Sequence, residues 1–478
     1  MSHSANPARS YFAYSTIHFY TNMDSLAVPV LNEECRQEKP RTCVERWMTP
    51  NGYLVLFFLM NTLNYMERVV ISGSSERILE FTRESVSTHA NTYFGALTSI
   101  FIGGYSIASI VFGYYVTRVR PFRVVVFGLI CWFLAAVASG LAPNYWVLLI
   151  ARMVSGVGEA GFQIVVPAYI NDAYPKEKVG FSMSVLYAAL SFGTAAGFML
   201  SGFVSQHYSW RLMYLAVAPF MIPAIVILFF VSYEPSKSEE GSVSFCTATF
   251  SLLKTPLFIA SFIVEAAGVY LCGAYLAFGN QLLIHLGLFT SESISSLVFG
   301  AICCVAGVIG SLLGGYALNR FRIDESFSRK HRLSCYAFHL FICCAIASLC
   351  FFVTAFATHI RWLFLLGFFL GFTAVFASNP SWTLVILNST TPLLQPMALG
   401  VAMVFYHLLG DVPAPIIVGR FLDWCLHRAK GDPAKEIMAY VYTHWFILLS
   451  LIIVLGSSLL VHIYTSRDYA KEKELAVC

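Results

Sequence analysis

Long apolar segments recur along nearly the whole chain, and they decide what it can fold into. Each is close to the ~20 residues that a helix needs to cross the roughly 30 Å hydrocarbon core of a bilayer. Hydrophobic residues make up 58% of the sequence and charged residues 12%, whereas soluble domains carry about 25% charged residues. We therefore predict an all-α membrane protein with twelve transmembrane helices. The expected spans are 52–72, 93–116, 123–142, 145–171, 179–205, 211–232, 256–285, 296–319, 333–357, 361–387, 396–422 and 440–465.

The longest polar break between these spans, residues 233–255, divides the predicted helices six and six. We expect two six-helix bundles, one over residues 49–232 and one over residues 256–466, joined by this segment as a cytosolic loop. Residues 1–48 are polar and carry Pro7, Pro29 and Pro40, which predicts a disordered cytosolic tail, and residues 467–478 are expected to form a second cytosolic tail.

Lysine and arginine residues concentrate in the tails and in alternate loops of the predicted topology. Because cytosolic loops carry the excess of basic residues in membrane proteins, this distribution predicts that both termini are cytosolic. The net charge of +4 reflects that excess and indicates no nucleic-acid partner. Residues 14–17, Tyr-Ser-Thr-Ile, fit a tyrosine-based sorting pattern, which favours the endolysosomal membrane, with the plasma membrane as the alternative.

A similar pattern follows the second helix of each predicted half. Gly113 precedes Arg118 and Arg123 in the first half, and Gly315 precedes Arg320 in the second. A glycine that permits close helix contact, followed by arginines at the membrane edge, resembles the conformational-switch loops of the major facilitator superfamily. The resemblance implies two pseudo-symmetric bundles with a solute site at their interface, which opens alternately to each side of the membrane.

Several further segments are similar to one branch of that superfamily, the Spinster family of lipid transporters. They fall in the expected order along the chain. They are Asn64–Arg68, Arg152–Asp172, Met183–Tyr187, Ser296–Gly300 and His407–Gly419. The resemblance implies transport of a lipid, and it associates the first-helix acid–arginine pair and the fourth-helix glutamate with proton coupling and substrate binding.

The sequence also departs from these family patterns. Thr117 and Asn319 stand where the superfamily usually has an acid before the first loop arginine, so the ion-pair lock made by that acid is expected to be weaker or built differently. Glu67 replaces the usual aspartate of the Spinster first helix, and Leu393–Pro396 replaces a basic turn of the animal members. The exact substrate therefore does not follow from the resemblance.

Four charged residues lie inside predicted spans of the first half. Arg152 and Glu159 are seven residues apart, two helical turns, so they share one helix face. Glu67 and Arg68 are adjacent, so their side chains leave the helix about 100° apart and need different partners. A charge in hydrocarbon costs roughly 2.5–3.5 kcal/mol even on insertion scales, and such residues normally face the protein interior or a transport path.

These four charges suggest a division of roles. Glu67 and Glu159 are the candidate proton-coupling residues, because a carboxyl group can gain or lose a proton as a cavity closes and opens. Arg68 and Arg152 are their candidate counter-ions and candidate substrate-binding residues, because a guanidinium group presents a planar fork of donors to a phosphate. The alternative is a static buried ion pair that fixes helix packing, and for Arg152 a place toward the cytosolic end of the bundle.

In the second half, Glu265 could provide a second protonation site or bind a cationic group, or could form a local hydrogen bond. His407 and Asp411 are spaced i,i+4, which permits a hydrogen bond, although packing and helix breaking around Pro413 and Pro415 also account for them. Aromatic residues could line an amphipathic cavity suited to an acyl chain, or serve only in helix packing. The candidates are Tyr187, Phe278, Trp382, Phe405 and Tyr406, and Tyr270, which follows Glu265 in the same span, is a further substrate-binding candidate.

No phosphate-binding glycine loop, metal-binding histidine pair or nucleophile elbow occurs in the sequence, which argues against an enzyme, a cofactor or a metal site. The leading hypothesis is a monomeric secondary active transporter that moves a lysophospholipid or sphingoid-type lipid by alternating access, with coupling to protons. The alternatives are a transporter of a small polar solute, such as a sugar or organic anion, and a membrane sensor that transports nothing.

Overall fold

The computed structural model describes residues 48–116, 118–174, 176–231, 233, 245–320, 328–390 and 395–477, and regular structure in these ranges is helical. The helices of the first half are α3 Pro50–Arg68, α4 Val70–Gly73, α5 Ser75–Ser85, α6 Ala90–Val116, α7 Pro121–Gly140, α8 Tyr145–Ala173, α9 Lys176–His207 and α10 Arg211–Phe230. Those of the second half are α11 Phe245–Leu252, α12 Pro256–His285, α13 Glu292–Arg320, α14 Arg329–Phe356, α15 Arg361–Ser389, α16 Gln395–Leu409, α17 Pro413–Ala429, α18 Pro433–Leu448 and α19 Ser450–Val477.

Local sequence signals set several helix starts. The side chain of Thr49 accepts a hydrogen bond from the backbone N–H of Gly52 at the start of α3, where Pro50 follows it. Asn144 caps α8 and Ser328 caps α14 in the same way. Such caps satisfy N–H groups that have no partner inside the helix, which matters most near a bilayer.

Eleven stretches of the described chain are long and apolar enough to cross a membrane. The predicted span 52–72 corresponds to α3 and α4 and is not among the eleven, because Asn61, Asn64, Glu67 and Arg68 make α3 too polar for that criterion. Large apolar side chains are exposed around the outside of the helices, among them Phe127, Ile150 and Leu349. The prediction of an all-α, multi-pass membrane protein is confirmed.

Several expected elements differ in the structure, and the span 440–465 is divided between α18 and α19 at Leu449. The span 396–422 is broken between α16 and α17 just before Pro413, which cannot donate a backbone hydrogen bond. The segment 233–255 contains the helix α11, which an apolar Phe-Cys-Thr-Ala-Thr-Phe-Ser-Leu run makes. The helix α19 continues to Val477, so most of the expected C-terminal tail is helical. The predicted N-terminal tail falls almost wholly outside the described residues.

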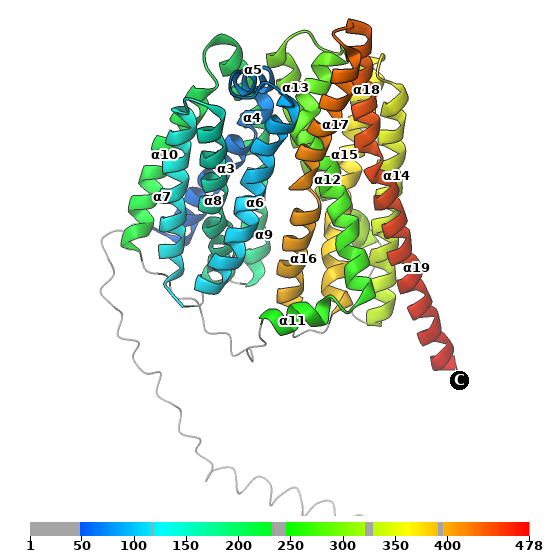
Figure 1. Ribbon diagram of the computed structural model, residues 1–478. Coiled ribbons are helices and arrows are strands. Elements are labelled where there is room, and N and C mark those ends of the chain that lie inside the picture. The colour runs from blue at the N-terminus through cyan, green and yellow to red at the C-terminus, as the bar shows by residue number, and fades with distance from the viewer. Residues whose placement is uncertain are drawn as a thin grey trace, which may run out of the picture. The chain divides into compact units, whose positions relative to one another are not determined.

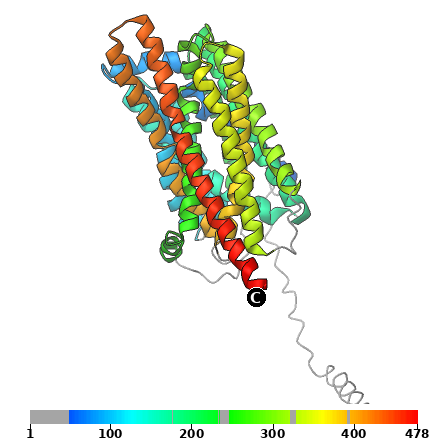
Figure 2. The ribbon, with the colours of Figure 1, turned by 90° about the vertical axis from the view of Figure 1, so that its right-hand side faces the viewer.

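The helices of each half pack mainly on one another, for example α6, α7 and α8 in the first half and α13, α14 and α15 in the second (Figure 1). In the second half, α19 runs alongside α12 and α14 (Figure 2). The halves meet where α9 packs on α13 and where α6 packs on α17. The bounds predicted for the two bundles, 49–232 and 256–466, stay a prediction.

The hydrophobic core differs between the two ends of the molecule. At the end where α5 lies, which we call the α5 end, one cluster joins both halves and includes Phe94, Phe198, Phe278 and Phe299. Toward the opposite end, where α11 and the C-terminus lie, each half has a cluster of its own among the described residues. The halves are therefore joined tightly at the α5 end.

Gly113 and Gly315 do not make the close helix contacts that the sequence suggested. A Cβ atom added at either position would meet no atom of the described chain within 4 Å. Arg118 and Arg123 are exposed beside the first of these glycines. Arg320 ends α13, and its side chain and Thr117 lie outside what the structure describes. The role of these loops as conformational switches stays a prediction.

Candidate functional site

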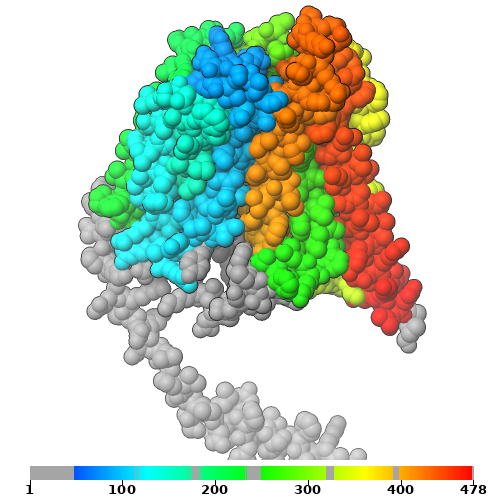
Figure 3. Space-filling view, viewed as in Figure 1, coloured from blue at the N-terminus to red at the C-terminus, as the bar shows by residue number. Residues whose placement is uncertain are grey.

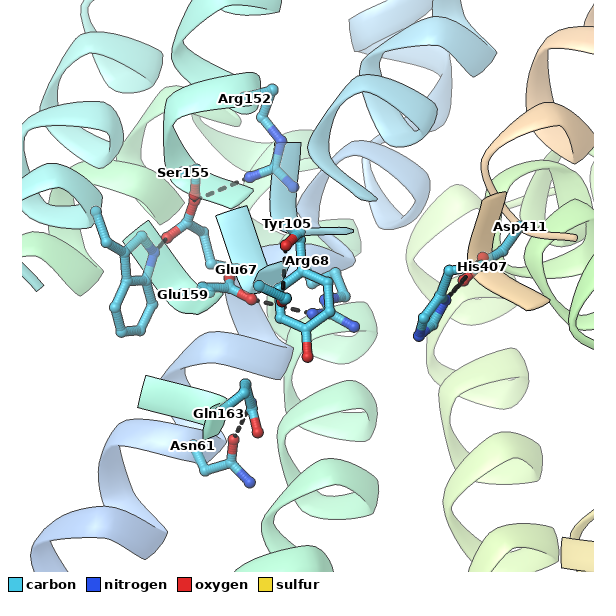
Figure 4. Close-up of polar contacts among 12 residues, drawn as sticks. Asn61, Glu67, Arg68, Tyr105, Arg152, Ser155, Glu159, Gln163, His407 and Asp411 are labelled. Carbon is cyan, nitrogen blue, oxygen red and sulfur yellow. Dashed lines mark hydrogen bonds and ion pairs between the residues drawn. The ribbon is translucent and has the colours of Figure 1, made fainter. Parts of the chain in front are cut away.

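Two crossed ion pairs connect α3 to α8. The guanidinium of Arg152 lies 2.9 Å from Glu67 Oε1, and the guanidinium of Arg68 lies 3.0 Å from Glu159 Oε2 (Figure 4). Because adjacent residues of a helix point in different directions, Glu67 and Arg68 reach different charges on the same face of α8. The spacing of the four charges in the sequence leads to this arrangement.

The first pair is sealed inside the protein. Glu67 is 0% and Arg152 1% exposed. The Glu67 carboxylate also accepts hydrogen bonds from the hydroxyl of Ser155, at 3.0 Å, and from the indole N–H of Trp132. Three donors therefore surround one carboxylate, which is the condition under which a buried charge is tolerated.

The second pair is less complete. Glu159 is buried, but its Oε1 has no hydrogen-bond partner among the described residues. The side chain of its partner, Arg68, keeps 24% of its surface exposed. This pair therefore combines an unpaired carboxylate oxygen with a guanidinium that other groups can reach, and the Glu67–Arg152 pair has neither feature.

Aromatic rings enclose both guanidinium groups. The Arg68 guanidinium carbon lies 4.8 Å from the centre of the Tyr65 ring, 4.9 Å from Phe101 and 5.7 Å from Tyr105. The guanidinium carbon of Arg152 lies 4.5 Å from the same Phe101 ring. These distances fit cation–π attraction, which stabilises a guanidinium group without neutralising it.

Glycines allow the helices that carry these groups to approach closely. A Cβ on Gly156 would overlap the backbone carbonyl oxygen of Phe101 on α6, and a Cβ on Gly158 would lie 2.7 Å from the carbonyl oxygen of Gly128 on α7. The Gly-Val-Gly run before Glu159 therefore draws α6 and α7 onto α8. That approach brings Phe101 and Trp132 within reach of the charges.

A group of amides lies next to the ion pairs on the same two helices. Gln163 donates to the side-chain oxygen of Asn61 at 2.8 Å, and Asn61 donates to the backbone oxygen of Leu186 at 3.0 Å. Asn64 is 1% exposed, and neither of its side-chain polar atoms has a partner in the described chain. The sequence analysis did not single out Asn61, Gln163, Ser155 or Trp132. Ser155 and Gln163 had a signal, since both share a helix face with Arg152 and Glu159.

Position along α8 corrects one expectation. α8 begins at Tyr145 at the α5 end, and Arg152 comes before Glu159 along it. Arg152 therefore lies nearer the α5 end than Glu159 does, not toward the end that the sequence analysis assigned to the cytosol.

Residues of the second half face this site across the interface. His407 Nδ1 lies 2.9 Å from Asp411 Oδ1, and the His407 ring packs edge-on against Tyr105 with 6.1 Å between ring centres (Figure 4). Tyr105 in turn contacts Arg68. Glu265 is half-buried on α12 and has no hydrogen-bond partner among the described residues.

Three aromatic candidates lie at different places relative to the charges. Trp382 donates its indole N–H to the backbone oxygen of Ser261 at 2.9 Å and packs edge-on against Tyr406, which is a packing role. Tyr187 is 55% exposed and lies within electrostatic range of Tyr65, the ring that packs on Arg68. Tyr270 lines a separate, mainly apolar cavity of about 340 Å³ between α12, α16, α18 and α19.

Comparison with known proteins decides the family. The profile described as Major Facilitator Superfamily matches residues 51–415. The chain belongs to the major facilitator superfamily. As a member of this superfamily it is a transporter of small molecules and not an enzyme.

The resemblance to Spinster proteins is confirmed within that superfamily. The chain is 27% identical to the "Probable sphingolipid transporter spinster homolog 1" of Arabidopsis thaliana in an alignment 435 positions long that covers 81% of this chain and 86% of that protein. It is 26% identical to "Protein spinster homolog 1" of Xenopus laevis, over 80% of this chain and 74% of that protein. A solved bacterial homolog of the human lysosomal transporter Spinster, in an inward-facing and unoccupied conformation, has the same fold. Its TM-score is 0.68 at 17% identity, and the match covers 88% of this chain and 98% of that one.

Proposed function

We propose that this superfamily member is a secondary active transporter that moves a lysophospholipid or sphingoid-type lipid by alternating access, coupled to protons. The observation that carries the proposal is the Arg68–Glu159 pair, in which an accessible guanidinium is bound to a carboxylate that has one unpaired oxygen. The Arabidopsis relative named as a sphingolipid transporter supports the choice of cargo.

The surroundings of Arg68 suit an amphipathic anion. Its guanidinium can present two parallel donors to a phosphate, and the rings of Tyr65, Phe101 and Tyr105 provide apolar surface beside that charge. A phosphorylated head group would bind to Arg68 while its acyl chain runs along aromatic side chains. We expect His407, across the interface on the second half, to contact the same head group.

The coupling follows from competition for one guanidinium. When an anionic head group binds to Arg68, Glu159 loses its counter-ion and is left as an unpaired carboxylate in a low-dielectric site. A proton that binds to Glu159 removes this cost. Lipid and proton therefore bind together and move in the same direction, which makes the protein a symporter.

Glu67 has a different role in this proposal. Its carboxylate already accepts from Arg152, Ser155 and Trp132, so it stays charged and holds Arg152 and α8 in place. It remains the second candidate for proton coupling, and the experiment compares it directly with Glu159.

The experiment measures uptake of a labelled lysophospholipid into liposomes that contain the purified protein, over a range of external pH. Replacement of Glu159 by Gln should leave uptake measurable and remove its dependence on pH. The Glu67→Gln/Arg152→Met double variant is the matched comparison, because it removes the Glu67 carboxyl without leaving Arg152 buried and unpaired, and we expect it to keep the pH dependence. Unchanged pH dependence in both variants would refute proton coupling through these residues.

Competition in the same liposomes tests the class of cargo. A lysophospholipid and a sphingoid base phosphate should each reduce uptake of the labelled lipid, whereas a hexose or a short organic anion should not. Inhibition by the small solute alone would support a transporter of small polar molecules instead.

We further propose that the protein acts as a monomer in the endolysosomal membrane, with both termini in the cytosol. The Spinster relatives and the basic loops support this placement. A fluorescent tag at either terminus should be quenched by a membrane-impermeant agent that is added to cells permeabilised only at the plasma membrane, and its signal should coincide with a lysosomal marker. Signal confined to the plasma membrane would contradict the placement.

A further inference from the structure

A short amphipathic helix, α5, connects the first and second spans at one end of the molecule. Ile78, Leu79 and Phe81 are buried on one face, whereas Glu80 and Glu84 are exposed on the other. In Figure 1 this helix is seen nearly end-on, so it lies across the axes of the spans. It packs on α6 and α8 of its own half and on α12 of the other. It is therefore placed between the two halves.

A carboxylate of the second half caps α5. Glu292, the first residue of α13, accepts a hydrogen bond from the backbone N–H of Glu76 at 2.9 Å and one from the hydroxyl of Ser75 at 3.4 Å. Both donors belong to the first turn of α5, where N–H groups have no partner in the helix and negative charge is favoured. Ser74, the residue at the N-cap position, provides no side-chain cap of its own. The cap therefore comes from the opposite half.

A second carboxylate of the second half caps α6 in the same manner. Asp423 on α17 accepts from the backbone N–H groups of Asn91, at 3.1 Å, and Thr92, at 2.8 Å. It also accepts from the side chains of the same two residues, at 3.0 and 2.6 Å. These residues form the first turn of α6. Two helices of the first half thus depend on two carboxylates of the second half for their N-terminal hydrogen bonds.

Further contacts join the two halves beside the Glu292 cap. His285 Nε2 lies 3.2 Å from Glu76 Oε1, and the His285 ring stacks on Tyr440 with 4.2 Å between ring centres. The hydrogen bond from His285 holds the pKa of Glu76 below its usual value, so Glu76 is charged at neutral pH. Figure 3 shows the blue atoms of the α5 region lying against the orange atoms of α17 and α18.

Next to Glu76, polar contacts between the two halves are buried. The side chain of Asn280 donates to Ser75 at 3.1 Å, and the hydroxyl of Ser296 donates to the backbone oxygen of Gly73 at 2.9 Å. Ser75, Asn280 and Ser296 are all 0% exposed. A hydroxyl at position 296 can reach solvent from the α5 end only if the halves separate there.

We propose that Glu292 and Asp423 are paired latches that hold the α5 end shut, and that this end opens only when both carboxylates leave the helix N-termini they cap. The proposal rests on alternating access in the proposed function. It assigns a role to two acids that lie outside the Arg68–Glu159 site. The hydrogen bonds of these two carboxylates stabilise the closed state, and the opening movement must break them.

The experiment follows opening with a thiol in place of the buried Ser296 hydroxyl. The purified S296C protein is treated in detergent with a hydrophilic maleimide, and mass spectrometry of the peptide that contains position 296 gives the labelling rate. Chymotrypsin, which cleaves after Phe289 and Phe299, gives a peptide around position 296 that contains no native cysteine. No lipid is added, so the measurement is independent of which cargo the protein carries.

Replacement of an N-cap side chain by alanine typically changes a conformational equilibrium about two- to thirtyfold. We expect E292A and D423A each to raise the labelling rate at position 296 about tenfold, because alanine removes the acceptor oxygens, and the two together to raise it further. E292D keeps the charge and should restore slow labelling in part. E80A is the matched control, because Glu80 is on α5 and, among the described residues, bonds to Arg77 of the same helix alone, and it should leave the rate unchanged.

Unchanged labelling in both E292A and D423A, with both variants eluting as a single folded species, would overturn the proposal. Equal acceleration by E80A would also overturn it, because general loosening of α5 would then explain the result. If the latch variants open as expected but no lipid is transported, the proposed cargo fails and the latch stands.

Discussion

At the scale of single residues, the molecule separates two charge pairs that look equivalent in the sequence. Glu67 is surrounded by three donors, whereas one oxygen of Glu159 has no partner in the described part of the chain and the other binds an accessible arginine. Burial without further partners makes a charge responsive to its surroundings, and burial with complete hydrogen bonding makes it rigid. We therefore expect substitutions in the two pairs to have different consequences.

Replacement of Arg152 by Met should destabilise the protein by about 3–5 kcal/mol, because it leaves the Glu67 carboxylate buried without its counter-ion. The thermal unfolding temperature of the purified protein measures this loss. The E67Q/R152M double variant should recover much of it, since no isolated charge then remains. A double variant less stable than R152M would contradict this account of the pair.

Arg68→Lys should leave folding nearly unchanged and reduce lipid uptake at low lipid concentration by about tenfold, because an ammonium group cannot form two parallel bonds to a phosphate. Uptake measured as a function of lipid concentration should show the loss mainly as a higher KM. A lower unfolding temperature with an unchanged KM would instead indicate a purely structural role for Arg68.

At the scale of helices, close packing depends on particular glycines, and the sequence alone did not identify which. Gly113 and Gly315 carry the family pattern but have open space beside them, whereas Gly156 lies directly against the backbone of α6. A glycine looks the same in the sequence in both cases, because the requirement comes from a neighbouring helix that is distant along the chain. Substitution by alanine distinguishes the two situations.

Gly156→Ala should abolish transport and lower the unfolding temperature, because the added methyl group would overlap the carbonyl oxygen of Phe101 and push α6 away from the ion pairs. Gly113→Ala is the matched control and should be tolerated. Equal loss of stability in both variants would contradict this account, because Gly113 would then also make a close helix contact.

The helix α5 provides a prediction about pH. Because the folded protein lowers the pKa of Glu76, the Glu76–His285 contact stabilises the protein fully above the unfolded-state pKa of about 4.3 and is lost as pH falls through the lowered value. The unfolding temperature of E76Q should therefore lie below that of the parent at pH 6 and converge with it on acidification below about pH 4. A difference that stays constant across this range would exclude an electrostatic contribution from Glu76.

At the scale of the whole molecule, periodic features of the sequence predicted the helices and their charged faces. Contacts between residues far apart in the sequence could not be predicted from it. Apolar segment lengths predicted the membrane helices, and the seven-residue spacing of Arg152 and Glu159 predicted one charged helix face. The sequence could not show that Glu67 has more hydrogen-bond donors than Glu159, because Trp132 reaches Glu67 from another helix. The caps made by Glu292 and Asp423 were missed for the same reason, since each joins residues more than 200 positions apart.

The proposed proton coupling and the proposed latches combine in one transport cycle. One shared core and two carboxylate caps close the α5 end, and the Arg68–Glu159 pair lies farther along α8, beneath that closure. In the proposed cycle, binding of lipid and proton at the pair changes the charge inside the protein, and opening of the latches then exposes the site to the other side.

Proton movement that accompanies lipid movement tests the central claim most directly. Liposomes that contain the protein and an internal pH-sensitive dye are given an inward gradient of lysophospholipid at equal pH on both sides. We predict that lipid entry acidifies the interior of liposomes with the parent protein, and that the E159Q protein carries lipid without acidification. Lipid entry with no pH change in the parent protein, or the same acidification in E159Q, would contradict the account.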